Sequence, residues 1–314
     1  MVKKMETIEI HIPTNTVYEE DLKDDGLLLP KKFNVGITTA CNMKCRMCLR
    51  SIYDIEIMNM DTSIWARILN LAMGNHISIG GLGEPLLHPQ FESFVYMARA
   101  FGISLNTTTN GLLATKHIES LQNFNQICFS MDGNSFYSHN DPVSFLNLVI
   151  LSKRIGKTKL WANIIRTKEN TGAVGNLIKT LTPFVRGFTI GNMAPWSKEL
   201  EEQSIGEPTP EFCIQPWFAP TINPKGDVYP CCLLGDLSML KEPAYYRGHE
   251  FDAKKYKMGH ISDFKEVWNN EKFAEFRRNL KNKRGICEHC PYTLGEAYVP
   301  NRMFEEMWIE KRRK

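Results

Sequence analysis

Short apolar segments alternate with longer segments of helical periodicity along the first two thirds of the chain. Residues 33–38, 76–79 and 104–109 are short and rich in apolar or β-branched side chains, which predicts strands. Residues 62–73 and 89–101 repeat apolar positions every three or four residues, which predicts amphipathic helices, the first capped by Asp61 or Thr62. The same reasoning predicts a short helix at 116–121, a strand at 126–131, a helix at 145–155, a strand at 159–165, a helix at 171–181 and a strand at 187–190.

This alternation of strands and helices predicts an α/β domain built on a parallel sheet with right-handed crossovers. Six such units would form a partial (β/α)6 barrel, but the alternation is equally compatible with a doubly wound sheet. We expect this domain to cover residues 31–200. Residues 1–30 form an N-terminal extension, with a strand predicted at 8–12.

The pattern changes after residue 196. Residues 196–210 are polar and contain Gly and Pro, which predicts a linker. Residues 218–222 and 227–230 then flank a turn-rich tetrapeptide and predict a β-hairpin. Together with helices predicted at 263–268 and 272–281, this indicates a small, cysteine-rich α+β domain over residues 201–314.

The composition narrows the cellular setting. Hydrophobic residues make up 43% and charged residues 23% of the 314, which is typical of a globular protein. A net charge of +3 gives no argument for a nucleic-acid partner. The N-terminus turns polar and acidic where a signal peptide is apolar, and no apolar stretch approaches the ~20 residues of a membrane helix. We therefore expect a cytoplasmic protein without nucleic-acid or membrane partners.

The cysteines carry the strongest chemical signal. There are nine, and all but Cys128 fall into spacings typical of metal ligands. Because disulfides rarely persist in a reducing compartment, clustered cysteines there indicate metal binding first. Cys128 lies in an apolar run and is expected to be a small buried side chain. The clustered cysteines are Cys41, Cys45, Cys48, Cys213, Cys231, Cys232, Cys287 and Cys290.

The first three cysteines directly follow the first predicted strand. Cys41, Cys45 and Cys48 place three thiolates within eight residues, enough to bind one small metal centre. A structural zinc site needs a fourth ligand, and none is close in the sequence. Three protein ligands leave one position open, which indicates chemistry. A zinc loop completed by a distant ligand is the alternative.

This Cys-x3-Cys-x2-Cys loop resembles the cluster motif of the radical S-adenosylmethionine (SAM) superfamily. The resemblance implies the partial barrel fold, and a [4Fe–4S] cluster bound by Cys41, Cys45 and Cys48 whose fourth iron is chelated by SAM. It also implies reductive cleavage of SAM to a 5′-deoxyadenosyl radical that abstracts hydrogen from a substrate. A flavodoxin- or ferredoxin-type protein would supply the electron.

Turns at the ends of the later strands resemble the SAM-binding motifs of the same family. The segment 80–85 (GGLGEP) resembles its Gly-Gly-Glu-Pro turn, 109–111 its Thr-Asn-Gly, and 130–133 its Ser-Leu-Asp-Gly. Each alone could be an ordinary turn, but their order and spacing after the cysteine loop favour a SAM site. The SAM-binding residues implied are Gly81, Gly83, Glu84, Pro85, Asn110, Ser130 and Asp132, with Arg166 as a further candidate after the fifth strand.

The later cysteines resemble the first part of a SPASM extension. Cys213-x12-Gly226-x4-Cys231, followed by Cys287-x2-Cys290, lacks the last cysteines of a full SPASM domain and matches its truncated form, the twitch domain. The resemblance implies a second, auxiliary [4Fe–4S] cluster on Cys213, Cys231, Cys287 and Cys290. A zinc site with four thiolates is the alternative. Cys232 could exchange with Cys231 as ligand, be buried, or donate hydrogen to a substrate radical, and it is the candidate catalytic residue.

The resemblance implies a radical SAM oxidoreductase or epimerase acting on a small sugar-like or natural-product precursor. A closed auxiliary cluster could accept the surplus electron of the substrate, which favours oxidation. A ribosomally made peptide is the rival substrate, but about 30 mostly polar N-terminal residues are too few for a leader-binding domain. A non-catalytic metal-binding or electron-transfer protein is the alternative from another class, and it would leave the SAM motifs unexplained.

Overall fold

A computed structural model describes most of the chain between residues 23 and 298. The described residues are 23–132, 142–193, 198–201, 204–205, 213, 215–246, 249–282, 286–287, 290 and 296–298. The strand predicted at 8–12 and most of the predicted linker lie outside them. Over the described residues, no helix combines the length and the apolar character that spanning a membrane requires.

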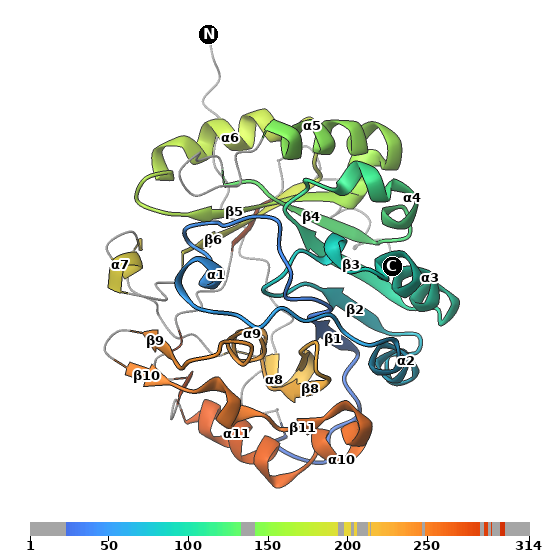
Figure 1. Cartoon of the computed structure of the whole chain (residues 1–314), viewed down its shortest axis with the longest axis vertical. Coiled ribbons are helices and arrows are strands. Elements are labelled where there is room, and N and C mark those ends of the chain that lie inside the picture. Colours follow the sequence, from blue (N-terminus) through green and yellow to red (C-terminus); the bar gives the residue numbers. More distant parts are fainter. Residues whose placement is uncertain are drawn as a thin grey trace, which may run out of the picture.

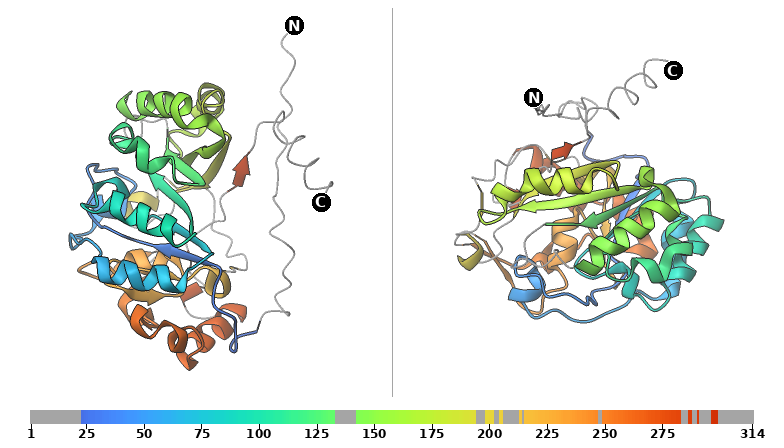
Figure 2. Two further views of the ribbon diagram at one scale, coloured as in Figure 1. Left: turned by 90° about the vertical axis from the view of Figure 1, so that its right-hand side faces the viewer. Right: turned by 90° about the horizontal axis from the view of Figure 1, so that it is seen from above.

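Six parallel strands follow one another across the sheet in their chain order. They are β1 (Lys32–Val35), β2 (His76–Ile79), β3 (Ser104–Thr109), β4 (Gln126–Ser130), β5 (Leu160–Arg166) and β6 (Gly187–Asn192). A doubly wound sheet reverses its strand order at a switch point, and this order does not reverse between β1 and β6. The consecutive order therefore decides for the partial (β/α)6 barrel, which Figures 1 and 2 show with its helices on the outside.

The helices between the strands largely match the predicted ones. Asp61 caps α2, because its carboxylate accepts the N–H of Ser63 at 2.7 Å. The prediction of one helix at 145–155 is wrong at both ends, since α5 begins at Pro142, whose fixed φ suits a first helical turn, and gives way to a π-helical turn at Ser152–Gly156. The helices are α1 (Leu49–Ile52), α2 (Thr62–Leu71), α3 (Phe91–Ala100), α4 (Ile118–Leu121), α5 (Pro142–Leu151) and α6 (Val174–Leu181), with 3-10 turns at Pro85–Leu87, Ala114–His117, Lys157–Lys159 and Thr171–Ala173.

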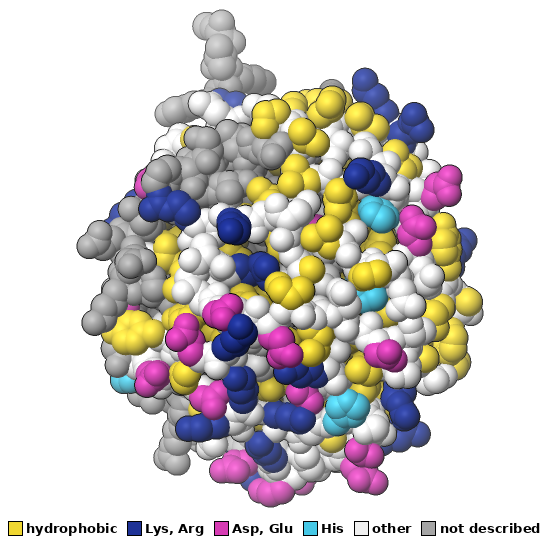
Figure 3. Space-filling model, in the orientation of Figure 1, with side chains coloured by type: hydrophobic (Ala, Val, Ile, Leu, Met, Phe, Trp, Pro, Cys, Tyr) yellow, Lys and Arg dark blue, Asp and Glu magenta, His cyan; other side chains and the backbone are white. Residues whose placement is uncertain are grey.

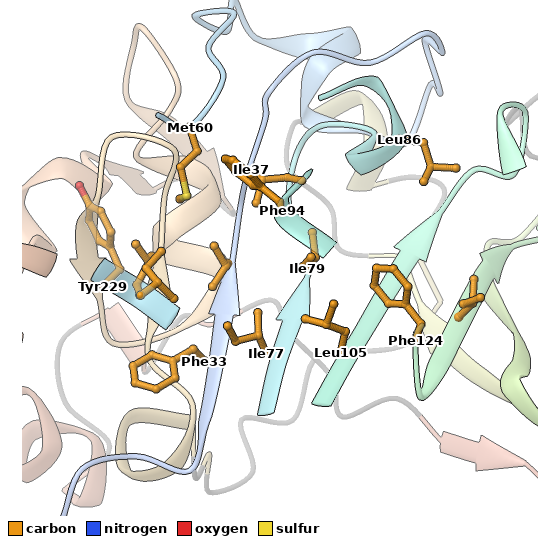
Figure 4. Packing of buried hydrophobic residues seen from close by; sticks show 14 of the residues in the cluster. Phe33, Ile37, Met60, Ile77, Ile79, Leu86, Phe94, Leu105, Phe124 and Tyr229 are labelled. Atoms are coloured by element: carbon orange, nitrogen blue, oxygen red, sulfur yellow. The ribbon is translucent and has the colours of Figure 1, made fainter. Parts of the chain in front are cut away.

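The outer face of the barrel carries the hydrophobic core. Phe33, Ile77 and Leu105 lie side by side on β1, β2 and β3, as Figure 4 shows, because their strands pair in that register. They are fully or almost fully buried, together with helix residues such as Trp65 and Phe94. Since side chains alternate between the two faces of a strand, the residues between them point to the inner face.

Most strands of the C-terminal part extend the barrel sheet, whereas β9 (Ala244–Tyr246) and β10 (His249–Phe251) form a separate two-stranded sheet. Strand β7 (Thr221–Ile222) pairs in parallel with β1, and β8 (Asp227–Tyr229) and β11 (Gly259–His260) continue the sheet antiparallel. At the other edge, β12 (Glu296–Tyr298) pairs with β6. One continuous hydrophobic cluster includes residues of both parts, such as Phe33 and Trp268.

The predicted hairpin is only partly right. Residues 221–222 and 227–229 do form paired strands, but Gln215–Phe218 is the helical turn α8. A short helix, α7 (Lys198–Glu201), also lies inside the predicted linker. The remaining C-terminal elements are α9 (Cys232–Leu237), β9 (Ala244–Tyr246), β10 (His249–Phe251), α10 (Phe264–Trp268) and α11 (Glu271–Lys281), with 3-10 turns at Ala253–Tyr256 and Ile261–Asp263.

Residues 23–29 form an arm that lies against the C-terminal elements. The indole N–H of Trp217 donates to the carbonyl of Lys23 at 2.7 Å, and that of Trp268 to the carbonyl of Leu28 at 2.9 Å. These bonds satisfy polar atoms of buried aromatic side chains, which stabilises their burial. The arm therefore belongs to the same packed unit as α8 and α10.

Arg277 of α11 fixes the start of this arm. It is fully buried at 0% exposure, and its guanidinium stacks 4.4 Å from the ring centre of Trp268 and 4.2 Å from that of Phe273. It donates to the backbone carbonyls of Pro216 at 3.0 Å and Asp24 at 2.8 Å. Burial lowers its pKa to about 10, so the guanidinium remains charged at neutral pH.

Candidate functional site

The loop after β1 holds the first three cysteines in a hydrogen-bonded frame. Cys48 caps α1, and its backbone N–H donates to the carbonyl of Cys45 at 2.9 Å. The Ser51 hydroxyl lies 2.9 Å from the Cys45 carbonyl and 2.7 Å from that of Cys48. The Arg50 guanidinium donates to the Thr39 carbonyl. These contacts fix the loop backbone and therefore the directions of the thiols.

The three thiols lie close enough to interact electrostatically. Burial, opposed by the backbone N–H of Arg50 and reinforced by the charges of Cys45 and Cys41, raises the pKa of Cys48 to about 11. Burial also raises the pKa of Cys41, whose sulfur accepts the N–H of Met43 at 3.4 Å. A metal centre supplies the positive charge that favours the thiolates, so these donors and thiols suit a metal cluster.

The cysteines are not arranged around a single point. Among the described residues, no three His, Cys, Asp or Glu side chains are arranged to hold one metal ion. In a four-iron cluster each thiolate binds a different iron, so the ligands need not converge on one point as those of a single ion do.

The turn after β2 packs directly on the cysteine loop. A Cβ at Gly83 would lie 2.2 Å from the carbonyl oxygen of Thr38 and 2.8 Å from that of Ala40, so only glycine fits. The backbone N–H of Glu84 donates to the Ala40 carbonyl at 2.7 Å. The turn and the loop are therefore one unit at the carboxyl ends of β1 and β2.

Glu84 joins this unit to the end of β3. Its carboxylate is 2% exposed and accepts the hydroxyl of Thr109 and the backbone N–H of Asn110, both at 2.7 Å. It also caps the following 3-10 turn by accepting the N–H of Leu86 at 3.2 Å. This carboxylate thus holds three segments together, and Pro85, also buried, begins the turn that it caps.

Asn110 lies between that turn and the cysteine loop. Its amide NH2 donates to the side-chain oxygen of Asn42 at 2.8 Å and approaches the Cys41 sulfur at 4.0 Å. The backbone carbonyl of Asn110 accepts the Ser144 hydroxyl at 2.6 Å. The structure therefore brings Glu84, Asn110 and Cys41 together, as the motif order led us to expect.

The candidates on β4 and β5 have different surroundings. Ser130 is partly exposed and pairs in register with Asn163. Asp132 is 1% exposed, and its carboxylate accepts the N–H of Ile165 at 2.6 Å. Arg166 is partly exposed and donates to the Asn192 side chain at 2.9 Å. Ser130 and Arg166 are thus accessible to a ligand, whereas the Asp132 carboxylate joins β4 to β5.

The inner face of the barrel is polar but almost uncharged. Its side chains alternate with the buried apolar ones, and aliphatic side chains, which dominate most barrel interiors, are largely replaced by amides and hydroxyls. The side-chain oxygen of Asn106 is buried without a partner in the described structure. Strand register places two polar rows across the sheet, Ser78, Asn106 and Gln126, and then Ser130, Asn163 and Thr189, with Thr108, Cys128 and Trp161 in the row between them.

The second cysteine set comes together from three segments. Cys213 precedes α8, Cys231 caps α9, and the 287/290 pair follows α11. Burial raises the pKa of Cys231 well above its usual value, and the charges of Cys287 and Cys290 raise it further. Burial also raises the pKa of Cys287 to about 12, with added effects from Cys290 and Cys213. The four thiols are therefore electrostatic neighbours, as ligands of one cluster must be.

Cys231 and Cys232 differ in what surrounds them. Cys231 interacts with Cys232 and with the 287/290 pair, whereas Cys232 interacts with Asp236, with the Gln215 side chain and with Cys213. The Cys232 backbone N–H also donates to the side chain of Gln215 at 3.1 Å. Burial raises the pKa of Cys232 to about 12, so its ground state is a neutral thiol. Cys231 therefore neighbours the 287/290 pair, and Cys232 neighbours Cys213.

Two surface ion pairs join the segment that follows the cysteine loop to the C-terminal part. Lys225 pairs with Glu56 at 2.8 Å and Lys241 with Asp54 at 2.6 Å. Figure 3 shows basic and acidic side chains interspersed over the lower part of the molecule, where the C-terminal elements lie. Exposed pairs contribute little energy each, so they fix the orientation of this contact more than its strength.

Some residues of the site carried no motif. Ser51, Asn42 and Gln215 have polar side chains on loops or short helices, where sequence gives no signal for their partners. Asp236 lies four residues after Cys232 on α9, a spacing that places both on one helix face and could have identified it.

Comparison with known proteins gives two domain matches. Residues 35–194 match the model of the radical SAM superfamily, and residues 213–291 match that of an iron–sulfur cluster-binding domain, SPASM. The chain is 23% identical over 305 aligned positions to the tungsten-containing aldehyde ferredoxin oxidoreductase cofactor-modifying protein of Pyrococcus furiosus, covering 80% of this chain and 84% of that one.

Two solved structures share the fold. BtrN in complex with AdoMet and 2-DOIA superposes with a TM-score of 0.55 at 19% identity, covering 84% of this chain and 94% of BtrN. Streptococcus suis SuiB bound to S-adenosylmethionine superposes with a TM-score of 0.59 at 15% identity, covering 84% of this chain and 72% of SuiB. These similarities confirm the expected architecture.

Proposed function

Since the chain belongs to the radical SAM superfamily, we propose that it oxidises an alcohol carbon of a small sugar-like or natural-product precursor. Converting a secondary alcohol to a ketone removes a hydrogen atom from carbon, a proton from oxygen and one further electron. The proposal therefore needs a radical source, an electron acceptor and a pocket for a polar molecule.

The radical SAM domain implies SAM and a [4Fe–4S] cluster, and the SPASM domain implies auxiliary iron–sulfur clusters. When bound, these groups supply a 5′-deoxyadenosyl radical and an acceptor for one electron. We assign Cys41, Cys45 and Cys48 to the SAM-binding cluster. We assign the auxiliary [4Fe–4S] cluster to Cys213, Cys231, Cys287 and Cys290.

We further assign the SAM site to the turns above β2 to β5. Gly81 and Gly83 leave the turn without side chains at two positions, Pro85 begins the 3-10 turn that follows, and Glu84 fixes the turn to Asn110. Ser130 and Arg166 are the accessible polar groups that can bind SAM directly. Asp132 contributes to the SAM site indirectly. Its carboxylate accepts the N–H of Ile165 and so holds the end of β4 against β5.

The observation that carries the choice of substrate is the polar, uncharged inner face. Rows of amides and hydroxyls such as Asn106, Asn163 and Thr189 offer donors and acceptors without charge. Such a surface forms hydrogen bonds with the hydroxyl groups of a ligand. It discriminates against ligands that would leave the amides and hydroxyls of the protein without hydrogen-bond partners. A neutral polyol ring fits this chemistry, and BtrN is a structural relative crystallised with a small molecule of its own.

Epimerisation is the second candidate, and Cys232 favours it. A neutral thiol can return a hydrogen atom to a substrate carbon radical, forming a C–H bond and leaving a thiyl radical that needs one electron and one proton to recover. A peptide substrate is the third candidate, in line with the fold shared with SuiB bound to precursor peptide SuiA, at 15% identity and a TM-score of 0.56. We propose a flavodoxin- or ferredoxin-type electron donor and a cytoplasmic setting for each of them.

The assignment is tested on the anaerobically reconstituted protein. We expect about eight irons, as two four-iron clusters require, and 5′-deoxyadenosine after reduction with SAM. Cys45→Ala should abolish this product, whereas Cys287→Ala should keep at least uncoupled SAM cleavage. The opposite pattern would reverse the cluster assignment. Wild-type protein that contains about eight irons but forms no 5′-deoxyadenosine would refute the proposed function.

The substrate class is tested by stimulation of 5′-deoxyadenosine formation. A panel of cyclic polyols is compared with a panel of unstructured peptides. We expect stimulation by the first panel only. Stimulation by peptides alone would favour the peptide candidate.

A further inference from the structure

We propose that Asp236 is a positioning residue for the SAM-binding turn, and that helix α9 thereby couples the auxiliary cysteines to SAM binding. The inference rests on the proposed SAM site. It concerns a carboxyl group that lies outside the SAM motifs and outside both cysteine sets.

Asp236 contacts the turn through its carboxylate. Leu82 and Asp236 line the same small cavity, and burial raises the pKa of the Asp236 carboxyl while its interaction with the Leu82 backbone N–H lowers it, so the carboxylate lies against the middle of the turn. Gly81, the neighbouring residue, has φ +117°, and a Cβ there would lie 3.0 Å from the Asp236 Oδ1. The glycine therefore leaves the space that lets the carboxylate reach Leu82.

The sheet fixes the helix that carries this carboxylate. Gly235 packs so closely on β7 that a Cβ there would lie 2.5 Å from the Thr221 Cγ2. Strand β7 in turn pairs in parallel with β1, with Thr221 opposite Asn34. Helix α9 is thus held beside the strand that leads into the first cysteine loop, and Asp236 reaches across the end of β1 to the turn after β2.

Residues next to Leu82 contact the cysteine loop and the end of β3, so the position of the turn affects the rest of the site. One residue after Leu82, Gly83 packs on the Thr38 carbonyl, and Glu84 binds the backbone N–H of Asn110. Moving the Leu82 backbone would therefore shift the SAM-binding surface as a whole. The other end of α9 carries the second cysteine set, since Cys231 is its cap. Six residues of helix connect a proposed cluster ligand to the proposed SAM site.

The surrounding cavity is too small for a ligand of its own. It has a volume of about 10 Å³, room for a single water, and Thr38, Asn223 and Asp236 are among its lining residues. A substrate or SAM group cannot enter it. Asp236 therefore acts through the turn and not by touching the reacting atoms.

The test compares Asp236→Leu, which removes the acceptor at similar size, with Asp236→Asn, which keeps an oxygen acceptor. Glu266→Gln on the exposed side of α10 is the control for loss of a carboxylate. In the reconstituted protein we expect Asp236→Leu to raise the Kd of SAM about 10-fold and to leave 5′-deoxyadenosine formation at saturating SAM within about 2-fold. The Asn and control variants should stay within about 3-fold in Kd. Unchanged SAM affinity in a folded Asp236→Leu protein would overturn the proposal.

Amide hydrogen exchange at Leu82 gives a second readout that needs no bound SAM. Exchange at this amide should accelerate at least 10-fold in Asp236→Leu and should not in Asp236→Asn. If the Leu variant does not fold, Asp236→Ala replaces it. Failure of the wild type to cleave SAM would refute the proposed function, whereas unchanged exchange at Leu82 would refute the role of Asp236, so the two failures are distinguishable.

The coupling through α9 is tested by a double-mutant cycle. Cys287→Ala should raise the Kd of SAM about 3-fold in the wild-type background and leave it unchanged when Asp236 is already Leu. Equal effects in both backgrounds would show that the auxiliary cysteines influence SAM without Asp236 and would overturn the coupling.

Discussion

Replacing Gly83 by Ala should separate the proposed SAM-binding turn from the cysteine loop. The added Cβ would lie 2.2 Å from the Thr38 carbonyl oxygen, about 1 Å inside the closest ordinary carbon–oxygen contact of ~3.3 Å. Both contacting atoms belong to backbone, so no side-chain rotation relieves the overlap. The turn and the loop must move apart by about 1 Å.

That movement has a calculable cost. The hydrogen bond from Glu84 N–H to the Ala40 carbonyl, now 2.7 Å, would lengthen to ~3.7 Å and be lost. An overpacked buried site costs about 1–3 kcal/mol, and a buried N–H without a partner about 1–3 kcal/mol more. At about 2 °C for each kcal/mol in a chain of this size, we expect the melting temperature to fall by roughly 4–12 °C.

The assay is anaerobic thermal unfolding of the reconstituted protein, with iron content and SAM affinity measured on the same samples. Gly80→Ala is the matched control for melting temperature and iron content, because a Cβ at that position meets nothing within 4 Å and its φ is not in the left-handed region. We expect the control to melt within about 1 °C of the wild type. Gly83→Ala protein with wild-type melting and wild-type SAM affinity would refute the reasoning.

Three further predictions follow from buried groups. Arg277→Met should destabilise the apo-protein by about 3 kcal/mol, because it removes a buried cation together with its stacking and hydrogen bonds; a loss below about 1 kcal/mol in urea unfolding would contradict this. Cys232→Ser should keep the iron content of the wild type and abolish any epimerised product while sparing oxidation; loss of auxiliary iron would instead make Cys232 a ligand. Burial raises the pKa of Asp236 from 3.8 to about 7, so between these values the folded state binds more protons than the unfolded state, and stability should fall as pH rises through this range. Asp236→Asn should lack that fall when melting temperatures are compared from pH 5 to pH 8, and parallel pH profiles for both proteins would contradict the assignment.

Local periodicity predicted the barrel elements well. The strands His76–Ile79 and Ser104–Thr109 coincide with their predicted bounds, because each is closed by turns whose residues are visible in the sequence. The order of the strands was not predictable, since the apolar pattern is the same for a barrel and a doubly wound sheet. Only the pairing of each strand with its successor from β1 to β6 distinguishes them, and such pairs, like Phe33 with Ile77, join residues far apart in the sequence.

In the candidate site, too, local motifs were predictable from the sequence and long-range contacts were not. The motif turns meet as expected, because the carboxyl ends of parallel strands share one edge. What the Glu84 and Asp132 carboxylates bind was not predictable, since their partners are backbone N–H groups of other strands. Asp236 belongs to no motif, and only the packing of α9 on β7 brings it to Leu82.

The position of β1 between β2 and β7 has a consequence for biogenesis. A ribosome completes Cys41, Cys45 and Cys48 long before it reaches Thr221 and Ile222, and until then one edge of β1 is open and α9 has not yet been made. Iron–sulfur delivery to the first cysteines can therefore take place on a half-built molecule whose loop is still uncovered. If the cluster proposed at these cysteines is delivered at that stage, synthesis of the later strands closes over it.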